Sequence, residues 1–366
     1  MSTTTQFDVV VVGAGPAGTM TAIGLARQGI STAIIERSAL SGFRVGETLP
    51  PEITPWLNDN ELLASFLLTD PVPSLGIQSA WGTSELSTID FIFNPHGNGW
   101  HIDRLKFNCM LIDQAIARGV TFIQKTSVVN AVRTSNAQWT LSARDKLHQQ
   151  DYTCQFIVDA TGIKSRIATL LGDEKLMTEN TISISKIVPL QEQETQNQSM
   201  LFLESAENGW WYLSPLPRHK AICSFITDKQ YFTVRKKQTA DVWQAELNNT
   251  VHLVTKLKTF DEAFYVCPVG PNRLKNIVGP GWLAVGDACV CLDPLSGGGI
   301  FAGLTSAEKA AVSIVDYLNN NVDSLAKYSL QMQTAYNSHL KIRKDYHKKE
   351  NRWLESSFWK RRCNTG

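Results

Sequence analysis

Hydrophobic residues dominate the start of the chain, where four valines follow Phe7 and Asp8. Residues 7–12 form a mostly β-branched run, which is typical of a parallel strand buried on both faces. The pattern then changes to a helical period that ends at Gly29, and residues 32–35 return to a strand pattern. The start of the chain therefore predicts a strand, a helix and a second strand.

Helical and strand-like patterns alternate through the rest of the chain. Helical periods are found at residues 55–68, 105–116, 241–257 and 301–315. Short strand-like pieces instead follow one another between residues 71 and 99, with residues 91–93 among them, and again between residues 181 and 266. We therefore expect an α/β fold with a discontinuous Rossmann-like domain (residues 1–70, 101–175 and 274–320), a β-sheet substrate domain (71–100 and 176–273) and a C-terminal helical segment (321–366).

The first predicted strand and helix are joined by a G-x-G-x-x-G motif. The motif consists of Gly13, Ala14, Gly15, Pro16, Ala17 and Gly18. Gly13 would let the chain turn tightly, Gly15 would leave room for a pyrophosphate, and Gly18 would let the helix lie close to the sheet. The free N–H groups at the helix start would bind phosphates, and Glu36 would accept hydrogen bonds from a ribose. An unrelated glycine-rich turn is the alternative, but strand, helix, second strand and acidic residue together favour a dinucleotide site.

Two later strands also end in loops suited to a ligand. The strand at residues 152–158 leads to Thr161 and Gly162, which should line the same cleft unless they form only a structural turn. The strand at residues 282–285 leads to Asp287, whose carboxylate suits the hydroxyls of a polyol. A second glycine-rich helix start follows, and the amides of Gly297, Gly298 and Gly299 could stabilise charge on a ring carbonyl.

Other candidate residues lie on an irregular loop and on an aromatic strand. Arg44 and Glu47 lie within residues 41–51, where glycines and prolines predict a fixed loop, although a surface turn explains them equally well. In residues 209–217, Trp211 and Tyr212 should point to opposite faces of a strand. They form either the wall of a pocket for a flat ring or part of the core.

The composition gives no sign of a nucleic-acid-binding, membrane-binding or metal-binding protein. The chain has 366 residues, a formal net charge of +1 and seven scattered cysteines. This balance gives no general attraction to nucleic acid or to a membrane surface, and no metal-binding spacing is present. No apolar run approaches the length of a membrane span. We expect a cytoplasmic protein with reduced thiols and leave its oligomeric state open.

Together these motifs resemble the p-hydroxybenzoate-hydroxylase-like flavoproteins. The resemblance extends in order from the first glycine motif and Glu36, through Arg104, to the Gly286–Asp287 and Gly297–Gly299 regions. It implies that the dinucleotide is FAD. It also implies that Glu36 binds the adenosine ribose, Arg104 the phosphate and ribityl region, and Asp287 the ribityl hydroxyls. Further implied contacts to FAD are those of Arg37, Arg44, Val128 near the adenine, and Pro294 through Ile300 around the isoalloxazine.

Residues 46–51 indicate which branch of this family the chain resembles. They read G-E-T-L-P-P and resemble the loop of the tryptophan-halogenase-related branch. Halogenases also need a lysine soon after this loop, whereas no lysine lies between Arg44 and Lys106, and the halogenase W-x-W-x-I-P motif is only partly present. The chain is therefore most similar to the flavoproteins that mature cysteine tryptophylquinone in glycine and lysine oxidases.

This resemblance implies an FAD-dependent monooxygenase that hydroxylates a tryptophan of a precursor amino-acid oxidase. O2 would be the co-substrate, and NAD(P)H or a separate flavin reductase would supply electrons. Glu47 and His101 are the titratable groups expected near the reaction, with Arg44 as an electrostatic partner. A halogenase or hydroxylase of a small aromatic metabolite and a non-catalytic FAD-binding maturation factor remain alternatives.

The end of the chain is basic. Residues 341–362 carry nine lysines and arginines and three acidic residues, with Trp353, Phe358 and Trp359 among them. Exposed aromatics on such a helix could bind an acidic protein surface. Alternatively, the helix packs these aromatics against the dinucleotide-binding domain.

Overall fold

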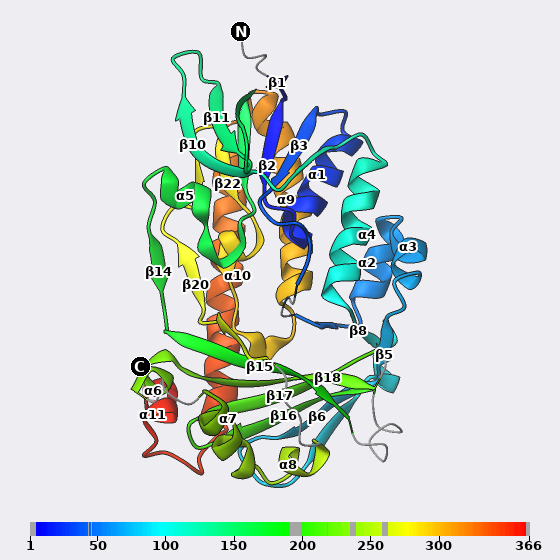
Figure 1. The fold of residues 1–366 in the computed structure, drawn as a ribbon, viewed down its shortest axis with the longest axis vertical. Coiled ribbons are helices and arrows are strands. Elements are labelled where there is room, and N and C mark those ends of the chain that lie inside the picture. The colour runs from blue at the N-terminus through cyan, green and yellow to red at the C-terminus, as the bar shows by residue number, and fades with distance from the viewer. Residues whose placement is uncertain are drawn as a thin grey trace.

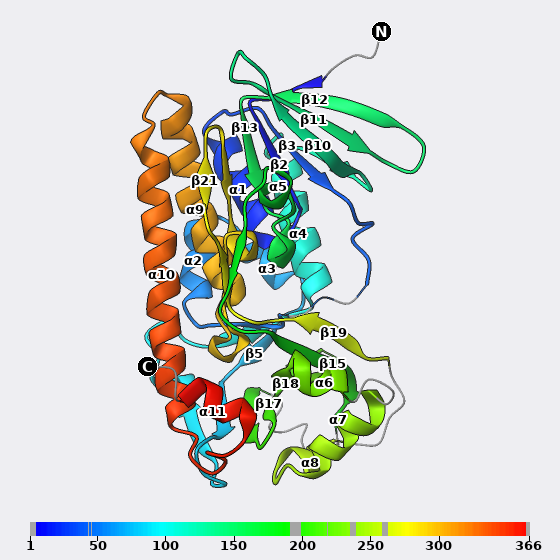
Figure 2. The ribbon, with the colours of Figure 1, turned by 90° about the vertical axis from the view of Figure 1, so that its left-hand side faces the viewer.

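The computed structural model describes residues 5–42, 44, 46–190, 199–217, 219–234, 239–257 and 263–363. In Figure 1 a parallel sheet with its covering helices lies above a second, larger sheet. The long helix α10 (Asp323–Lys348) runs beside both parts (Figure 2). The α/β fold class expected from the sequence is confirmed.

The upper part is built around a six-stranded sheet. Its strands are, in spatial order, β21 (Val278–Gly279), β22 (Trp282–Ala284), β13 (Phe156–Asp159), β2 (Val9–Val12), β3 (Thr32–Glu36) and β9 (Thr121–Gln124). From β22 to β9 neighbouring strands are parallel, so the loops after β2, β13 and β22 meet at one edge. The helices α1 (Pro16–Arg27), α4 (Arg104–Ile116) and α9 (Gly299–Leu318) pack together beside this sheet, and β2 is completely buried.

Small sheets surround this core. One consists of β1 (Thr5–Gln6), β12 (Gln149–Cys154), β11 (Trp139–Arg144) and β10 (Ser127–Arg133). Another consists of β4 (Thr48–Leu49), β8 (Gly99–His101) and β5 (Val72–Ser74), and a third of β14 (Lys175–Met177), β20 (Asn272–Leu274) and β23 (Val290–Cys291). The last two lie where the chain passes between the upper and lower parts (Figure 1).

The lower part is a seven-stranded sheet. Its strands are, in spatial order, β19 (Tyr265–Pro268), β15 (Thr181–Pro189), β18 (Lys220–Asp228), β17 (Gly209–Leu216), β16 (Met200–Ala206), β6 (Gly76–Ala80) and β7 (Ser87–Asp90). Strands β6 and β16 are parallel, and the other neighbours are antiparallel. Residues 76–90 and residues 181–268, which are separate segments of the chain, thus build one sheet.

Short helices between the strands accompany the lower sheet, and two predicted helices are divided. The helices are α6 (Lys229–Val234), α7 (Thr239–Asn248) and α8 (Leu253–Lys256). The expected helix at residues 241–257 is broken between α7 and α8, because the Glu204 carboxylate accepts hydrogen bonds from the N–H groups of Val251 and Leu253. The expected helix at residues 55–68 is divided into α2 (Ile53–Asp59) and α3 (Leu63–Leu67), with Glu61 at φ +57° between them.

Residues 91–93 form a short 3-10 helix rather than strand. The Asp90 side chain accepts a hydrogen bond from the N–H of Ile92, which favours this turn at the end of β7. The strand prediction at residues 91–93 was wrong because the apolar pattern does not reveal such a local side-chain hydrogen bond.

The aromatics of the C-terminal segment are covered by the lower sheet. Helix α11 (Ser357–Cys363) buries Phe358 and Trp359, and the Trp359 ring meets that of Trp81 edge to face. The Trp359 indole N–H donates to the carbonyl oxygen of Ala206 at the end of β16. These side chains therefore pack against the lower sheet, neither exposed for a partner nor against the upper part. No helix in the described ranges is long and apolar enough to cross a membrane.

Candidate functional site

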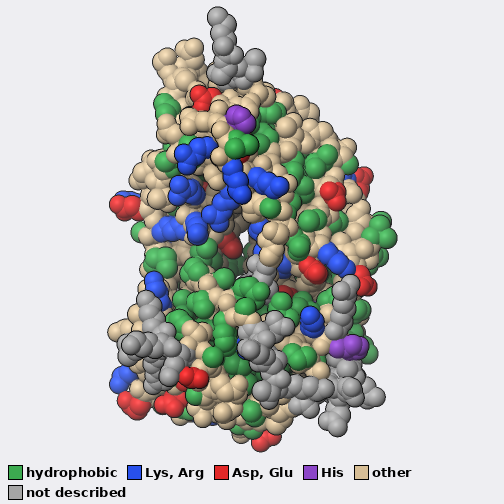
Figure 3. Space-filling view, viewed as in Figure 1, with side chains coloured by type: hydrophobic (Ala, Val, Ile, Leu, Met, Phe, Trp, Pro, Cys, Tyr) green, Lys and Arg blue, Asp and Glu red, His purple; other side chains and the backbone are tan. Residues whose placement is uncertain are grey.

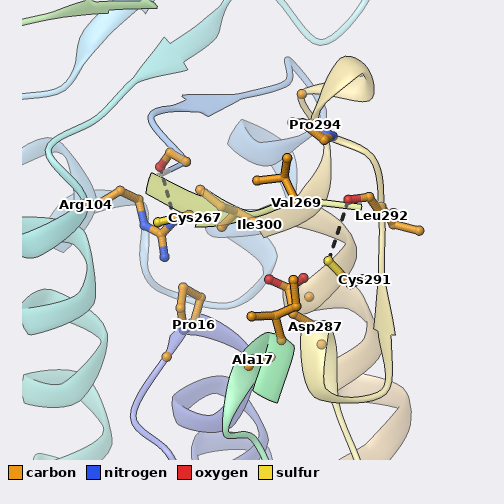
Figure 4. Close-up of a pocket in the computed structure, with 18 of the residues that line it drawn as sticks. Pro16, Ala17, Arg104, Cys267, Val269, Asp287, Cys291, Leu292, Pro294 and Ile300 are labelled. Carbon is orange, nitrogen blue, oxygen red and sulfur yellow. Dashed lines mark hydrogen bonds between the residues drawn. The ribbon is translucent and has the colours of Figure 1, made fainter. Parts of the chain in front are cut away.

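A cavity of about 300 Å³ lies between the upper and lower parts. Figure 3 shows the molecule hollowed at its centre, with lysine and arginine side chains gathered beside the hollow. The cavity wall includes the loops after β2, β13 and β22, the start of α4, and the strands β16, β17 and β19. In Figure 4, Arg104 and Asp287 lie on opposite sides of the cavity, near Pro16, Ala17, Cys267, Val269 and Ile300.

The first glycine loop forms a narrow cradle at this cavity. A methyl group added to Gly13 would lie 2.3 Å from the Ala160 carbonyl oxygen, and one on Gly18 would lie 2.2 Å from the Gly13 carbonyl oxygen. A methyl group on Gly15 would meet no atom within 4 Å. Gly15 is also the N-cap of α1 and lines the cavity. The loop thus holds strand and helix close together while leaving space in front of free helix N–H groups, which suits a pyrophosphate.

Glu36 stabilises this loop directly. Its carboxylate accepts hydrogen bonds from the N–H of Ala14 at 2.8 Å and from the N–H of Ser38 at 2.8 Å. Arg37 is exposed beyond the end of β3, and Val128 is buried on β10. None of these three side chains is part of the cavity wall. Glu36 therefore shapes the loop, and any contact of these residues with an adenosine lies outside this cavity.

The loop after β13 contributes through its backbone. The Thr161 hydroxyl and N–H both donate to Asp159 Oδ1, at 2.6 and 3.0 Å. Gly162, at φ +68°, lines the cavity next to Ala160, whereas Thr161 does not. The Thr161 side chain therefore fixes the turn that presents Gly162.

Arg104 and Asp287 place opposite charges in the cavity wall. Arg104 begins α4, whose N-terminus is capped by the Asp103 carboxylate, and its Nη1 donates to the Gly46 carbonyl oxygen at 3.2 Å. Burial raises the pKa of Asp287, while the charges of Arg104 and Lys175 act in the opposite direction. Arg104 is half-buried, and Asp287 is exposed to the cavity. A cation and a carboxylate in the wall of one cavity can hold a phosphate and a polyol respectively.

The second glycine loop closes the cavity from the other side. The Asp293 side chain accepts a hydrogen bond from the N–H of Leu295, and Gly297 adopts φ +60° before α9 begins at Gly299. Pro294, Gly297, Gly299 and Ile300 line the cavity, whereas Gly298 does not. A backbone with few side chains at a helix start can lie close to a flat ring.

Glu47 and Tyr212 form the polar end of the cavity. Tyr212 Oη donates to Glu47 Oε2 at 3.4 Å, and the N–H of Gly46 donates to Oε1 at 2.7 Å. Burial raises the pKa of Glu47 to about 7, although Arg104 and these hydrogen bonds lower it. Glu47 can therefore gain or lose a proton near neutral pH, as an acid–base group must.

The other residues expected to be catalytic lie outside the cavity wall. His101 is buried, with Nδ1 at 3.4 Å from Thr48 Oγ1 and 3.3 Å from Ser214 Oγ, and burial lowers its pKa to about 3. The Arg44 guanidinium donates to Ser38 Oγ at 3.0 Å. Trp211 points to the opposite face of β17, where it stacks on Phe225. His101 thus contacts one residue of the wall, Thr48, by a hydrogen bond.

Several wall residues were missed in the sequence. Leu201 and Leu203 on β16 lie on the same face as Tyr212, because Leu203 pairs with Tyr212 across the two strands. Their alternation predicts a shared face, but only the pairing shows that this face meets the glycine loops. Cys267 on β19 also lines the cavity and had no sequence signal.

No group of three or more His, Cys, Asp or Glu residues is arranged to hold a metal ion anywhere in residues 5–363 that the structure describes. The donor set instead fits a dinucleotide, with an open glycine cradle for a pyrophosphate, Asp287 for a polyol and a second glycine loop for a ring.

Comparisons with known proteins give the family. The family model described as FAD binding domain matches residues 6–334, and the chain belongs to this family. An FAD-dependent oxidoreductase of Marinomonas mediterranea, LodB, is 26% identical over 363 residues, which are 98% of this chain and 97% of LodB. The protein is thus a flavin-dependent oxidoreductase, and the expected use of FAD is supported.

Solved structures share the fold. The flavin-dependent halogenase CmlS has a TM-score of 0.89 at 22% identity, covering 100% of this chain and 68% of CmlS. QhpG, a peptidyl tryptophan dihydroxylase essential for tryptophylquinone cofactor biogenesis, has a TM-score of 0.79 at 23% identity, covering 98% of this chain and 78% of QhpG. The resemblance to the halogenase-related flavoprotein monooxygenases is confirmed.

Proposed function

We propose that this member of the FAD binding domain family hydroxylates a tryptophan side chain of a partner protein. The partner would be a precursor amino-acid oxidase, and the modified residue would become part of its cysteine tryptophylquinone. One oxygen atom of O2 enters an indole C–H bond, the other leaves as water, and NAD(P)H or a flavin reductase supplies two electrons. Bound, reduced FAD supplies the activation of O2.

The observation that carries this proposal is the composition of the cavity wall opposite the glycine loops. Leu201, Leu203 and Tyr212 form an apolar, partly aromatic surface on the lower sheet. Glu47 is hydrogen-bonded to Tyr212 at its edge. A flat, electron-rich ring can lie on such a surface, and its N–H can donate to a carboxylate. An indole has both properties.

Glu47 is the residue that we propose for proton transfer. Substitution of an indole C–H bond requires a proton to leave the ring after the oxygen has been added. A carboxylate with a pKa of about 7, buried beside the apolar wall, can accept that proton and return it to water. Arg104, whose charge favours the ionised form of Glu47, would keep the carboxylate available.

Halogenation of a small aromatic metabolite is the second candidate. The TM-score of 0.89 with the halogenase CmlS favours it. Against it, the described residues of the cavity wall include no lysine, and no lysine lies between Arg44 and Lys106. The similarity of its fold to that of QhpG, a peptidyl tryptophan dihydroxylase, supports the choice of a protein substrate.

Mass spectrometry of bound proteins tests the proposal. The protein would be isolated with its partners from source cells grown under ¹⁸O2, alongside Asp287→Ala and a matched Asp145→Ala variant at an exposed turn. We expect a tryptophan peptide of one large partner to gain ¹⁸O with the native protein and with Asp145→Ala, but not with Asp287→Ala. Label from water instead of O2 would contradict a monooxygenase.

The same preparations separate the alternatives. Oxygen- or halide-dependent conversion of free indoles or phenols, with an unmodified partner, would establish a small-molecule enzyme. FAD binding without any oxygen-dependent turnover would establish a non-catalytic maturation factor. Either result would overturn the proposed function.

A further inference from the structure

A buried group of charges joins the C-terminal segment to the second glycine loop. Arg343 on α10 donates from Nε to Asp293 Oδ2 at 2.7 Å, and Asp293 is the residue that caps the loop containing Gly297. The same guanidinium donates to both oxygens of Glu179, at 2.6 and 2.7 Å. Arg343 is 7% exposed and Asp293 2% exposed. One side chain thus links two separate parts of the chain.

A second arginine extends this group into the lower sheet. Arg362 on α11 forms a salt bridge with Glu179 at 2.6 Å and donates hydrogen bonds to Asp228 at 2.9 Å and to the Thr181 hydroxyl at 3.1 Å. Thr181 begins β15 and Asp228 ends β18. The two arginines and three carboxylates therefore bind the C-terminal segment to the start of the lower sheet.

Both ends of this group are next to the cavity. Asp293 itself lines the cavity on the side of the glycine loop. In another part of the wall, the Thr181 carbonyl accepts a hydrogen bond from the N–H of Val269, which lines the cavity with Cys267. The charges thus connect two separate parts of the cavity wall.

Asp293 is also held by its backbone. Its N–H donates to His339 Nε2 at 3.1 Å, so α10 contacts the residue twice, one helical turn apart. Each oxygen of its carboxylate accepts a different hydrogen bond. Oδ1 accepts from the N–H of Leu295, which orders the loop, and Oδ2 accepts from Arg343. Loss of Arg343 would free the carboxylate that orders the loop.

We propose that Arg343 is a positioning residue that fixes the loop from Asp293 to Gly299 against the sheet wall of the cavity. The C-terminal segment thereby sets the gap in which FAD and the substrate ring meet. This role goes beyond the proposed function, because it requires FAD binding and does not depend on a tryptophan substrate.

Arg343→Met tests this role, with Arg352→Met as the matched control. Arg352 belongs to the same segment and donates to Glu350 at 2.7 Å, but it contacts neither the glycine loop nor Glu179 in the described structure. In FAD-free protein we expect hydrogen exchange at Leu295 to become about tenfold faster in Arg343→Met, as when a buried ion pair loses one partner. We expect FAD affinity to fall by about the same factor and the visible band of bound FAD to shift.

Arg343→Lys provides the second variant, because it keeps the charge and protects against failure to fold. A lysine can reach one carboxylate but cannot bind Glu179 and Asp293 together. We expect an intermediate exchange rate and an intermediate FAD affinity. The proposal is overturned if Arg343→Met or Arg343→Lys lowers the unfolding temperature as Arg352→Met does, while loop exchange, FAD affinity and the flavin spectrum stay native.

Discussion

The phenol oxygen of Tyr212 lies 3.4 Å from Oε2 of Glu47 and donates a hydrogen bond to it. Tyr212 belongs to β17 of the lower sheet, and Glu47 belongs to the loop before β4. The hydrogen bond therefore joins the lower sheet to the loop before β4 at the edge of the cavity. It brings a carboxylate with a pKa of about 7 to the edge of an aromatic wall.

Replacement of Glu47 should remove a titration from the pH profile of turnover. The pKa of about 7 means that native activity should rise with pH to a plateau above neutrality, as the carboxylate becomes ionised. Glu47→Gln should lower the rate by about 10²-fold and leave no inflection near pH 7. The measurement is the rate of oxygen-dependent product formation from about pH 5 to about pH 9. Full activity in Glu47→Gln would exclude an acid–base role.

Tyr212→Phe should move that inflection rather than remove it. The Tyr212 hydrogen bond lowers the pKa of Glu47, so its loss should shift the inflection to higher pH. Trp211→Phe is the matched control, because Trp211 packs on the other face of the same strand against Phe225 and Trp243. It should cost stability while leaving the pH profile unchanged. An equal shift in both variants would mean that the strand, not the hydroxyl, sets the pKa.

The two aromatic neighbours show how far the sequence could lead. Alternation along a strand predicts that Trp211 and Tyr212 face opposite sides, but it does not show which side is the cavity. That choice depends on the pairing of β17 with β16 and on the position of the whole sheet against the glycine loops. Local signals predicted the glycine cradle and Asp287, because these motifs bind ligands through their own backbone and side chains.

Long-range contacts limited the remaining predictions. The contact of Glu36 with a ribose stays a prediction, and the sequence did not show that its carboxylate also accepts hydrogen bonds from the N–H groups of Ala14 and Ser38. For the C-terminal segment the sequence left open a partner surface or packing of its aromatics on the dinucleotide-binding domain, and it gave no sign that Arg343 pairs with Glu179 and Arg362 with Asp228. Such pairings join residues more than a hundred positions apart, and neither composition nor periodicity determines them.

Substitutions at two glycines of the first loop should separate FAD binding from stability: one should lower FAD affinity, and the other should lower the free energy of unfolding. Gly15→Ala adds a methyl group that meets no atom within 4 Å, so the free energy of unfolding should stay nearly native while FAD affinity falls about tenfold or more. Gly18→Ala places a methyl group 2.2 Å from the Gly13 carbonyl oxygen and should destabilise the fold by about 1–3 kcal/mol. Denaturant unfolding of FAD-free protein and titration with FAD measure both. If Gly15→Ala binds FAD normally, the pyrophosphate does not lie at this loop.

Glu47 and His101 should make the free energy of unfolding change with pH in opposite directions. Burial raises the pKa of Glu47 from 4.5 to about 7, so the folded state binds more protons there and stability falls as pH rises through this window. Burial lowers the pKa of His101 from 6.5 to about 3, so the unfolded state binds more protons and stability rises with pH up to 6.5. Between about pH 5 and 6.5 the two slopes should nearly cancel.

Replacing either residue alone should therefore leave only the other residue's contribution to the pH dependence of the unfolding free energy. From about pH 5 to 6.5, Glu47→Gln should gain about 2 kcal/mol of unfolding free energy, because only the His101 slope remains and each pKa unit is worth about 1.4 kcal/mol. His101→Gln should lose a similar amount over the same interval, and the double variant should be nearly flat again. Urea unfolding of the FAD-free protein at both pH values measures these differences. A native slope that survives unchanged in both single variants would show that neither buried group governs the stability of this site.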